Sequence, residues 1–317
     1  MAPAIASNIA MHKRILKLMG NRFEISVVSD DVLWAEERIN EAVAEIQRIE
    51  KLFTTFDGSS QTNLINLNAG IQPVKVNKEV YELIARSLKI SDLTQGAFDI
   101  TYGSLDKRFW NFDINMTSLP DSATAKKTVR LINYKNVILD PKQQTVFLKE
   151  KGMRIGFGGI GKGYAADRAK HVLQQQGAKS GIVNAAGDLI TWGMQPTGLP
   201  WTIGIADPNS KHHPFSYLNV SNMAVATSGN YEKYAIIDRK KYSHTIDPKT
   251  GFPVSGIKSV TIICPSAELA DAMATPVMVM GKQVGLNLIN QMQNIACIII
   301  DNQNRLYSSS NIKIKST

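Results

Sequence analysis

The stretch RIGFGGIGKGYAADRA, residues 154–169, decides between the fold classes open to this chain. It places five glycines around a single lysine, Lys162. The spacing fits two phosphate-binding patterns: GxGxxG, through Gly156, Gly158 and Gly161, and GxxxxGK, from Gly156 to Lys162. The first is typical of a doubly wound, dinucleotide-binding sheet, and the second of a P-loop nucleotide-binding fold. Each pattern makes a further demand on the surrounding sequence.

Neither demand is met. A P-loop ends in Ser or Thr, whose hydroxyl binds Mg²⁺, and this chain has Gly163 there. A dinucleotide-binding turn opens a βαβ unit and is followed about 20 residues later by an acid at the end of the next strand. Here residues 1–153 precede the glycine stretch, and the next expected strand ends at Asn184, which is not an acid. What remains is a backbone that a ligand can approach closely, with Lys162 and a helix N-terminus favouring negative charge. The alternative is a structural bend that packs a helix on a sheet.

Composition describes a globular protein large enough for a substantial core: 317 residues, 44% hydrophobic and 20% charged. The net charge of +9 favours an anionic partner, such as a nucleotide or an acidic protein. The basic residues are scattered in short groups, so we do not predict nucleic-acid binding. Cys264 and Cys297 lie in apolar runs, which predicts two buried thiols. No apolar run reaches the ~18 residues of a membrane-spanning helix.

Periodicity predicts a mixture of helices and strands. We expect a strand or hairpin over 15–28, broken at Gly20-Asn21, and an amphipathic helix over 32–53. Further helices are predicted at 76–94, 121–132, 164–176, 267–275 and 281–291, and strands at 134–140, 145–151, 181–186, 201–206, 217–227, 234–240, 257–264 and 295–301. Regular βαβ alternation is missing, which indicates an α+β fold. We expect one domain over 15–317, preceded by an extension over 1–14 that is vector-derived or disordered.

Two pairs of polar residues are candidates for chemistry. Asp271 and Thr275 are four residues apart, so one helical face would carry a carboxylate and a hydroxyl, oxygen ligands that suit Mg²⁺. The same spacing is common on solvated helix faces. His244 precedes Asp247-Pro248, where a stiff loop could hold it as a general base. The alternative is an exposed histidine on a rigid turn.

Eight segments together resemble the ApbE family, the FAD:protein FMN transferases. They are LMGNRFEI (18–25), FTTFD then SQTNLINLN (53–68), GAFDIT (96–101), GGIGKGYAAD (158–167), NAAGDL (184–189), ATSGNY (226–231), HTIDPKTGFP (244–253) and ADAMATPVMVMG (270–281). They follow the family's order and spacing over nearly the whole chain. The resemblance implies a T-fold-like α+β architecture of mixed antiparallel sheets and packed helices.

The resemblance also implies an activity and a set of site residues. Family members use Mg²⁺ to split the FAD pyrophosphate, pass FMN to a Thr or Ser hydroxyl of an acceptor flavoprotein, and release AMP. The catalytic residues would be His244, as base, and Lys162. The metal would be held by Asp271, the hydroxyl of Thr275 and the carbonyl of Gly159. The implied FAD-binding residues are Met19, Phe56, Ala97, Phe98, Asp99, Gly156, Lys162 and Thr245.

The sequence departs from the family pattern at several positions. Gly156 stands where an Asp is usual, which removes a negative group from the FAD site. Ala274 stands where some members carry a second acidic metal ligand. Phe56 replaces the more common Tyr. Pro276 follows the metal-site threonine; it cannot donate to the carbonyl of Ala272 and is expected to kink the helix.

Two other functions fit the same residues. With water in place of the hydroxyl, the site would be an FAD pyrophosphatase giving FMN and AMP; with a disabled metal site, the protein would bind FAD without catalysis. The resemblance implies that the acceptor is a membrane redox subunit and that the protein acts on the periplasmic side of the membrane. No export signal is visible in residues 1–12, and a cytoplasmic location stays open.

Overall fold

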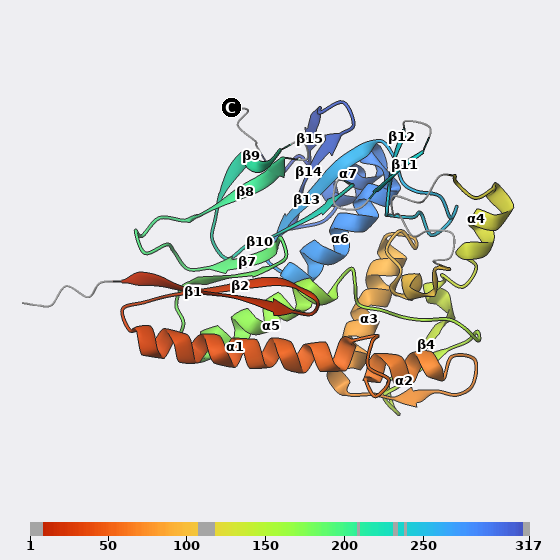
Figure 1. Ribbon diagram of the computed structural model, residues 1–317, viewed down its shortest axis with the longest axis horizontal. Coiled ribbons are helices and arrows are strands. Elements are labelled where there is room, and N and C mark those ends of the chain that lie inside the picture. The colour runs from red at the N-terminus through yellow and green to blue at the C-terminus, as the bar shows by residue number, and fades with distance from the viewer. Residues whose placement is uncertain (1–8, 107–117, 208–209, 231–233, 238–239, 313–317) are drawn as a thin grey trace, which may run out of the picture.

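The fold is built on an eight-stranded antiparallel sheet, seen in a computed structural model that describes residues 9–106, 118–207, 210–230, 234–237 and 240–312 (Figure 1). The strand order is β1-β2-β6-β7-β10-β13-β14-β15. These strands are β1 (Ala10–Leu18), β2 (Asn21–Ser29), β6 (Gly181–Ala185), β7 (Asp188–Trp192), β10 (Ala224–Gly229), β13 (Ile257–Cys264), β14 (Ala296–Asp301) and β15 (Leu306–Ser308). Helices pack against this antiparallel sheet, which confirms the predicted α+β class.

The first two strands form the predicted hairpin. Its turn is Met19-Gly20, and both residues have positive φ, 51° and 71°. The pairing runs from Leu18 opposite Asn21 to Ala10 opposite Ser29. Residues 10–14 therefore belong to the sheet, so the first strand begins five residues before the expected domain start at residue 15. The alternating polar pattern of this edge strand hid it, because half of its side chains face water. Residues 1–8 of the expected extension lie outside the described residues.

Alternate residues of the sheet pack into two different hydrophobic clusters. Ala224 and Ala226 belong to the main core beneath the helices, whereas Val225 faces a second cluster on the opposite side. That second cluster is covered by the hairpin β8 (Trp201–Asp207) and β9 (Ser210–Val220). Side chains of a strand alternate between faces, so this sheet is buried on both sides at its centre.

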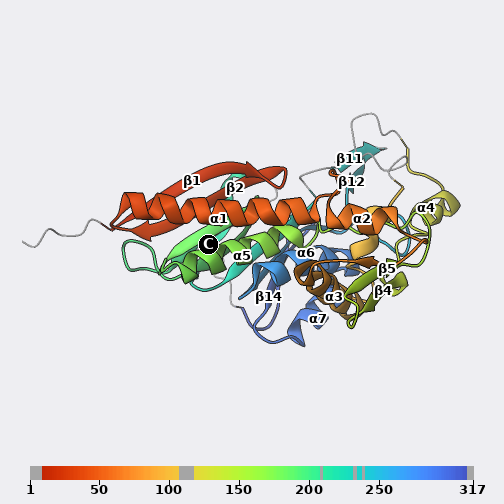
Figure 2. The ribbon, with the colours of Figure 1, turned by 90° about the horizontal axis from the view of Figure 1, so that it is seen from below.

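Helix α1 (Val32–Phe53) confirms the helix predicted over 32–53. Asp31 caps it by accepting from the Trp34 backbone N–H at 3.0 Å. Its buried stripe is Ala35, Ile39, Ala42, Ile46, Ile49 and Phe53, at helical spacing. The helix lies beside α5 (Gly161–Gln175) below the sheet (Figure 2). Helix α1 thus supports the element that begins in the glycine stretch.

Helices α5 and α6 (Ala267–Met280) are in close contact. A Cβ added to Gly163 would lie 2.0 Å from the carbonyl oxygen of Ala267, so only glycine fits there. The Asp167 carboxylate caps α6, accepting from the Ser266 hydroxyl and from the N–H groups of Ala267 and Glu268 at 2.8–3.0 Å. Helix α5 begins three residues before the predicted Tyr164, so Gly161–Gly163 form its first turn.

The remaining elements surround this centre. They are α2 (Gln61–Leu67), β3 (Val74–Lys75), α3 (Lys78–Leu93), the 3₁₀ helix η1 (Ile100–Ser104), α4 (Ser122–Thr128), η3 (Tyr134–Asn136), β4 (Val137–Asp140), β5 (Thr145–Leu148), β11 (Tyr234–Ile237), β12 (Lys240–Ser243) and α7 (Lys282–Asn290). The predicted helices at 76–94 and 281–291 and the strands at 134–140 and 145–151 are confirmed in type. Helix α2 and strand β7 were not predicted. The single strand predicted over 217–227 is two strands, because the chain turns at Asn222, whose φ is 58°.

Helix α6 is longer than predicted and continues through Pro276 to Met280. Both cysteines are free and buried, as predicted. Within the described residues, no helix is long and apolar enough to cross a membrane.

Candidate active site

The glycine stretch lies where several predicted nucleotide-binding residues meet. An added Cβ on Gly161 would be 3.7 Å from the Met19 methyl, and one on Gly159 would be 3.5 Å from the Phe98 ring. On Gly156 it would be 3.9 Å from Thr55, one residue before Phe56. The β1–β2 turn, the end of α1 and the GAFD segment therefore converge on this backbone, although they are far apart in the sequence.

Lys162 is the cation of the site and lies in the first turn of α5. Its ammonium pairs with the Asp188 carboxylate and lies 3.6 Å from Asp271 Oδ1. The other oxygen of Asp271 accepts the backbone N–H of Gly163 at 3.0 Å. Three charged side chains from α5, β7 and α6 are thus gathered at one helix N-terminus, which itself favours negative charge.

Asp188 is almost fully buried and has a perturbed pKa. Loss of hydration on burial raises the pKa of its carboxyl, and the nearby Asp271 charge raises it further, against the opposing effect of Lys162. Its second oxygen accepts the Thr227 N–H at 3.3 Å. Two carboxylates and one ammonium leave the cluster with a net negative charge when both acids are ionised. The site is therefore suited to a further cation.

The predicted metal ligands fit a hard cation. Asp271 is 7% exposed, and Thr275 lies one helical turn further along α6. The Thr275 hydroxyl donates to the Ser228 hydroxyl on β10 at 3.4 Å. Mg²⁺ prefers oxygen and commonly takes one or two carboxylates together with phosphate and water. Asp271, Thr275 and the Gly159 carbonyl are donors of that kind. No cluster of three His, Cys, Asp or Glu side chains suited to a metal occurs in the described part of the chain.

The GAFD segment is buried, and its aspartate has a structural role. Ala97 and Phe98 are each 7% exposed. Asp99 caps η1: one oxygen accepts from the N–H and hydroxyl of Thr101, and the other accepts the Tyr134 N–H at 2.8 Å. Burial raises the pKa of Asp99. These bonds hold the turn that places Phe98 against Gly159, so the direct role of Asp99 is to shape the site.

His244 and Thr245 follow β12 in a loop fixed by the same segment. The N–H of Ile246 donates to the Tyr102 hydroxyl of η1 at 3.1 Å. An added Cβ on Gly251 would lie 2.1 Å from the Ala125 carbonyl of α4, so this loop also packs tightly there. Thr245 is buried and His244 is half-buried. These contacts tie the loop to η1 and α4, and the role of His244 as a base stays a prediction.

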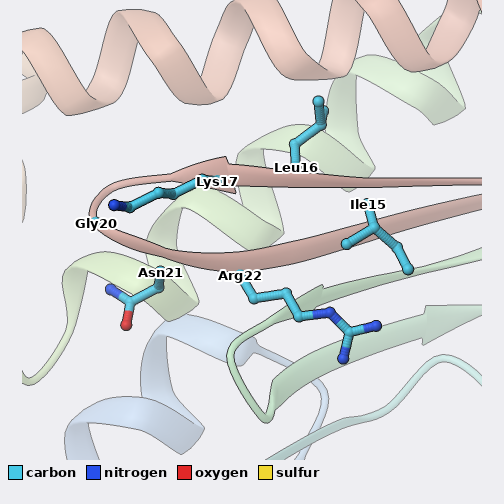
Figure 3. Close-up of a pocket in the computed structure, with 6 residues that line it drawn as sticks. All are labelled: Ile15, Leu16, Lys17, Gly20, Asn21 and Arg22. Atoms are coloured by element: carbon cyan, nitrogen blue, oxygen red, sulfur yellow. The ribbon is translucent and has the colours of Figure 1, made fainter.

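Phe56 differs from the other predicted FAD-binding residues because its side chain is 99% exposed. A shallow groove of about 420 Å³ lies at the β1–β2 hairpin next to Met19, lined by Ile15, Leu16, Lys17, Gly20, Asn21 and Arg22 (Figure 3). It contains no carboxylate and none of the predicted site residues. The charged side chains described above are gathered instead around Lys162.

Asp188 is the site residue that sequence reasoning missed. It lies 26 positions after Lys162 and opens β7 after a two-residue turn, Ala186-Gly187, in which both residues have positive φ. The segment NAAGDL was noticed only as part of the resemblance. A signal was present nonetheless: an acid starts an otherwise apolar strand, LITW, and a buried acid needs a partner.

Comparison with known proteins identifies the family to which the chain belongs. The sequence profile of the ApbE family matches residues 19–299. A Klebsiella pneumoniae protein named FAD:protein FMN transferase is 31% identical over 92% of this chain and 90% of its own, and an Escherichia coli protein of the same name is 28% identical over 87% and 80%. The crystal structure of the ApbE protein from Thermotoga maritima superposes with a TM-score of 0.85 at 30% identity, covering 95% of this chain and 97% of its own.

A second solved structure, the apo form of the Pseudomonas stutzeri flavinyl transferase ApbE, has a TM-score of 0.83 at 26% identity and covers 95% of each chain. The fold and the similarity to these proteins define this protein as an enzyme of the flavin transferase class. The chain belongs to the ApbE family.

Proposed function

We propose that this enzyme transfers FMN from FAD to a Thr or Ser hydroxyl of an acceptor protein, using Mg²⁺ and releasing AMP. One observation carries the proposal: Lys162 and Asp271 meet at the N-terminus of α5, directly beside the backbone that Met19 and Phe98 approach. A pyrophosphate there would face the Lys162 ammonium at the N-terminus of a helix, while its flavin end would meet apolar side chains. The FAD:protein FMN transferase name of the relatives supports this substrate.

The chain's own groups account for the charge changes of the reaction. The acceptor oxygen forms a bond to the phosphorus of the FMN half, and the bond from that phosphorus to the bridging oxygen breaks, so that AMP leaves with the bridging oxygen. Lys162 neutralises charge that develops on the phosphates. His244 accepts the proton of the attacking hydroxyl, which is a weak nucleophile unaided. Asp271, Thr275 and the Gly159 carbonyl would hold Mg²⁺, which supplies Lewis-acid stabilisation when bound.

Gly156 and Ala274, which stand where family members carry acidic residues, affect the charge available for metal binding. Both remove acidic groups, so Asp271 is the one carboxylate left in the proposed ligand set. One carboxylate is within the one or two that Mg²⁺ commonly uses, and we therefore favour catalysis over simple FAD binding.

One assay separates the three candidate functions. The protein is incubated with FAD and Mg²⁺, with and without a Thr-containing acceptor peptide, and AMP is measured by chromatography. A transferase releases AMP only with acceptor, and the peptide gains the mass of FMN. Release without acceptor, with free FMN, identifies a pyrophosphatase. No release in either case identifies a non-catalytic FAD-binding protein and overturns the proposal.

We further propose that the acceptor is a membrane redox subunit and that transfer occurs on the periplasmic side of the membrane. The family resemblance supports both statements. Fractionation of cells that express the native gene, followed by a search for in-gel flavin fluorescence with and without the gene, tests them. A soluble cytoplasmic acceptor as the only gene-dependent fluorescent band would contradict both.

A further inference from the structure

The Lys162 ammonium lies near Asp271, the carboxylate proposed to bind the metal, so the ammonium and a divalent cation would compete for that carboxylate. It pairs with Asp188 and lies 3.6 Å from Oδ1 of Asp271. The other oxygen of Asp271 is held by the Gly163 N–H, so Oδ1 is the one available to a metal. An ammonium that moved fully onto Asp271 would oppose metal binding, because like charges close together in a buried site repel strongly.

We propose that Asp188 is a positioning residue that holds the Lys162 ammonium away from Asp271, leaving Asp271 for the metal. This inference rests on the proposed function. Asp188 is 4% exposed and comes from β7, a central strand, so its position is fixed by the sheet. The Thr227 N–H holds its second oxygen at 3.3 Å. Lys162 is closer to Asp188 than to Asp271, as the proposal requires.

The Asp188→Asn substitution isolates the charge. An amide oxygen can still accept from Thr227, and the volume barely changes, so the strand keeps its local bonds. The ammonium loses its closest anionic partner and turns toward Asp271. We expect metal affinity to fall for two reasons: a nearby negative charge is lost, and Lys162 now competes for Asp271. Only the second reason depends on Lys162.

A double-mutant cycle therefore tests the proposal. Mn²⁺ binding is measured by electron paramagnetic resonance for the intact enzyme, Asp188→Asn, Lys162→Gln and the double variant, each with FAD and without acceptor. We expect Lys162→Gln to tighten Mn²⁺ binding. We expect Asp188→Asn to weaken binding about tenfold more in the native background than in the Lys162→Gln background, a coupling equal to about 1.4 kcal/mol.

Two results would overturn the role of Asp188. If Asp188→Asn weakens Mn²⁺ binding equally, or more, in the Lys162→Gln background, Asp188 is a metal ligand or a distant charge. If none of the four proteins binds Mn²⁺, the metal site itself is wrong and the positioning role falls with it. The AMP-release assay on the unmodified enzyme reports the proposed function separately, so failure of the inference is distinguishable from failure of the function.

The chain provides a matched control in Asp301, another buried aspartate paired with a cation. It binds Arg305 at 2.8 Å and lies at the far end of β14, three strands from β7. Asp301→Asn should lower the thermal midpoint but leave Mn²⁺ affinity within twofold. Thermal unfolding of all variants, followed by circular dichroism, shows which ones are folded at the assay temperature. If Asp188→Asn is unfolded there, Asp188→Glu, which keeps the charge, must restore Mn²⁺ binding; failure to do so also overturns the proposal.

Discussion

Substitution of Gly163 by alanine is the sharpest test of how the site is assembled. The added Cβ would lie 2.0 Å from the Ala267 carbonyl oxygen, 2.5 Å from its carbon and 2.8 Å from Asp271 Cβ. Ordinary contact begins near 3.4 Å, so α5 and α6 would have to separate by about 1.4 Å. The two nearest atoms belong to the Ala267 backbone and the third is the Asp271 Cβ, which is bonded directly to the helix backbone, so no side-chain rotation relieves the clash.

The expected loss of stability follows from three contributions. Overpacking of this kind costs about 1–3 kcal/mol. Separation of the helices also breaks the bond from the Gly163 N–H to Asp271, and a hydrogen bond to a charged group contributes about 1.5–3 kcal/mol. Alanine restricts the unfolded chain more than glycine does, which offsets about 0.4–1 kcal/mol. We therefore expect Gly163→Ala to lower the free energy of unfolding by about 1.5–5.5 kcal/mol.

Urea denaturation followed by tryptophan fluorescence measures this change. Gly158→Ala is the control. Gly158 lies in the same glycine stretch, but a Cβ added there would have no heavy atom within 4 Å. The control should change the free energy of unfolding by less than about 1 kcal/mol. Gly163→Ala should also weaken Mn²⁺ binding, since Asp271 moves. Equal denaturation midpoints for the two variants would refute the close α5–α6 contact on which the site is built.

Further outcomes are expected elsewhere in the site and the core. Asp271→Ala should abolish flavin transfer through loss of the metal; full activity at millimolar Mg²⁺ would rule out that ligand. His244→Ala should slow transfer while FAD affinity, measured by fluorescence quenching, stays within about threefold; a variant that simply loses FAD makes His244 a binding residue. Burial raises the pKa of both Cys264 and Cys297 to about 12, so at pH 8 they stay protonated, and iodoacetamide should label neither until urea unfolds the chain. Labelling of the folded protein at the rate of a free thiol would contradict their burial.

The sequence predicted those elements whose pattern is local. Helix α1 was found because its apolar residues recur at helical spacing, and the β1–β2 hairpin because Gly20-Asn21 interrupts a strand pattern. Strand β7 was missed because it is buried along its whole length and therefore shows no alternation. Helix α2 was missed because it is short and mostly polar, and depends on the Ser60 cap and on packing.

The site was predictable only in part, for a different reason. Lys162 was singled out by the glycine pattern and Asp271 by its helical spacing to Thr275, and the resemblance then gave both residues roles. Their proximity follows from the way α5 packs on α6. Asp188 could not be joined to them from the sequence, because its contact with Lys162 depends on which strand lies beside α5. The absence of a hydroxyl at position 163 argued against a P-loop. The structure adds a steric cause, since any side chain larger than hydrogen would meet Ala267.

The Asp167 cap of α6 has a consequence for motion. It ties the start of α6 to α5, and the Gly163–Asp271 bond ties the same two helices again one turn along. Two attachments oppose rotation as well as separation of the helices, so the backbone at Lys162 is held in place relative to Asp271, and the lysine side chain alone can turn. Conformational adjustment to a bound ligand then has to come from other segments. The Phe56 side chain, exposed beyond the end of α1, lies outside this pair of attachments.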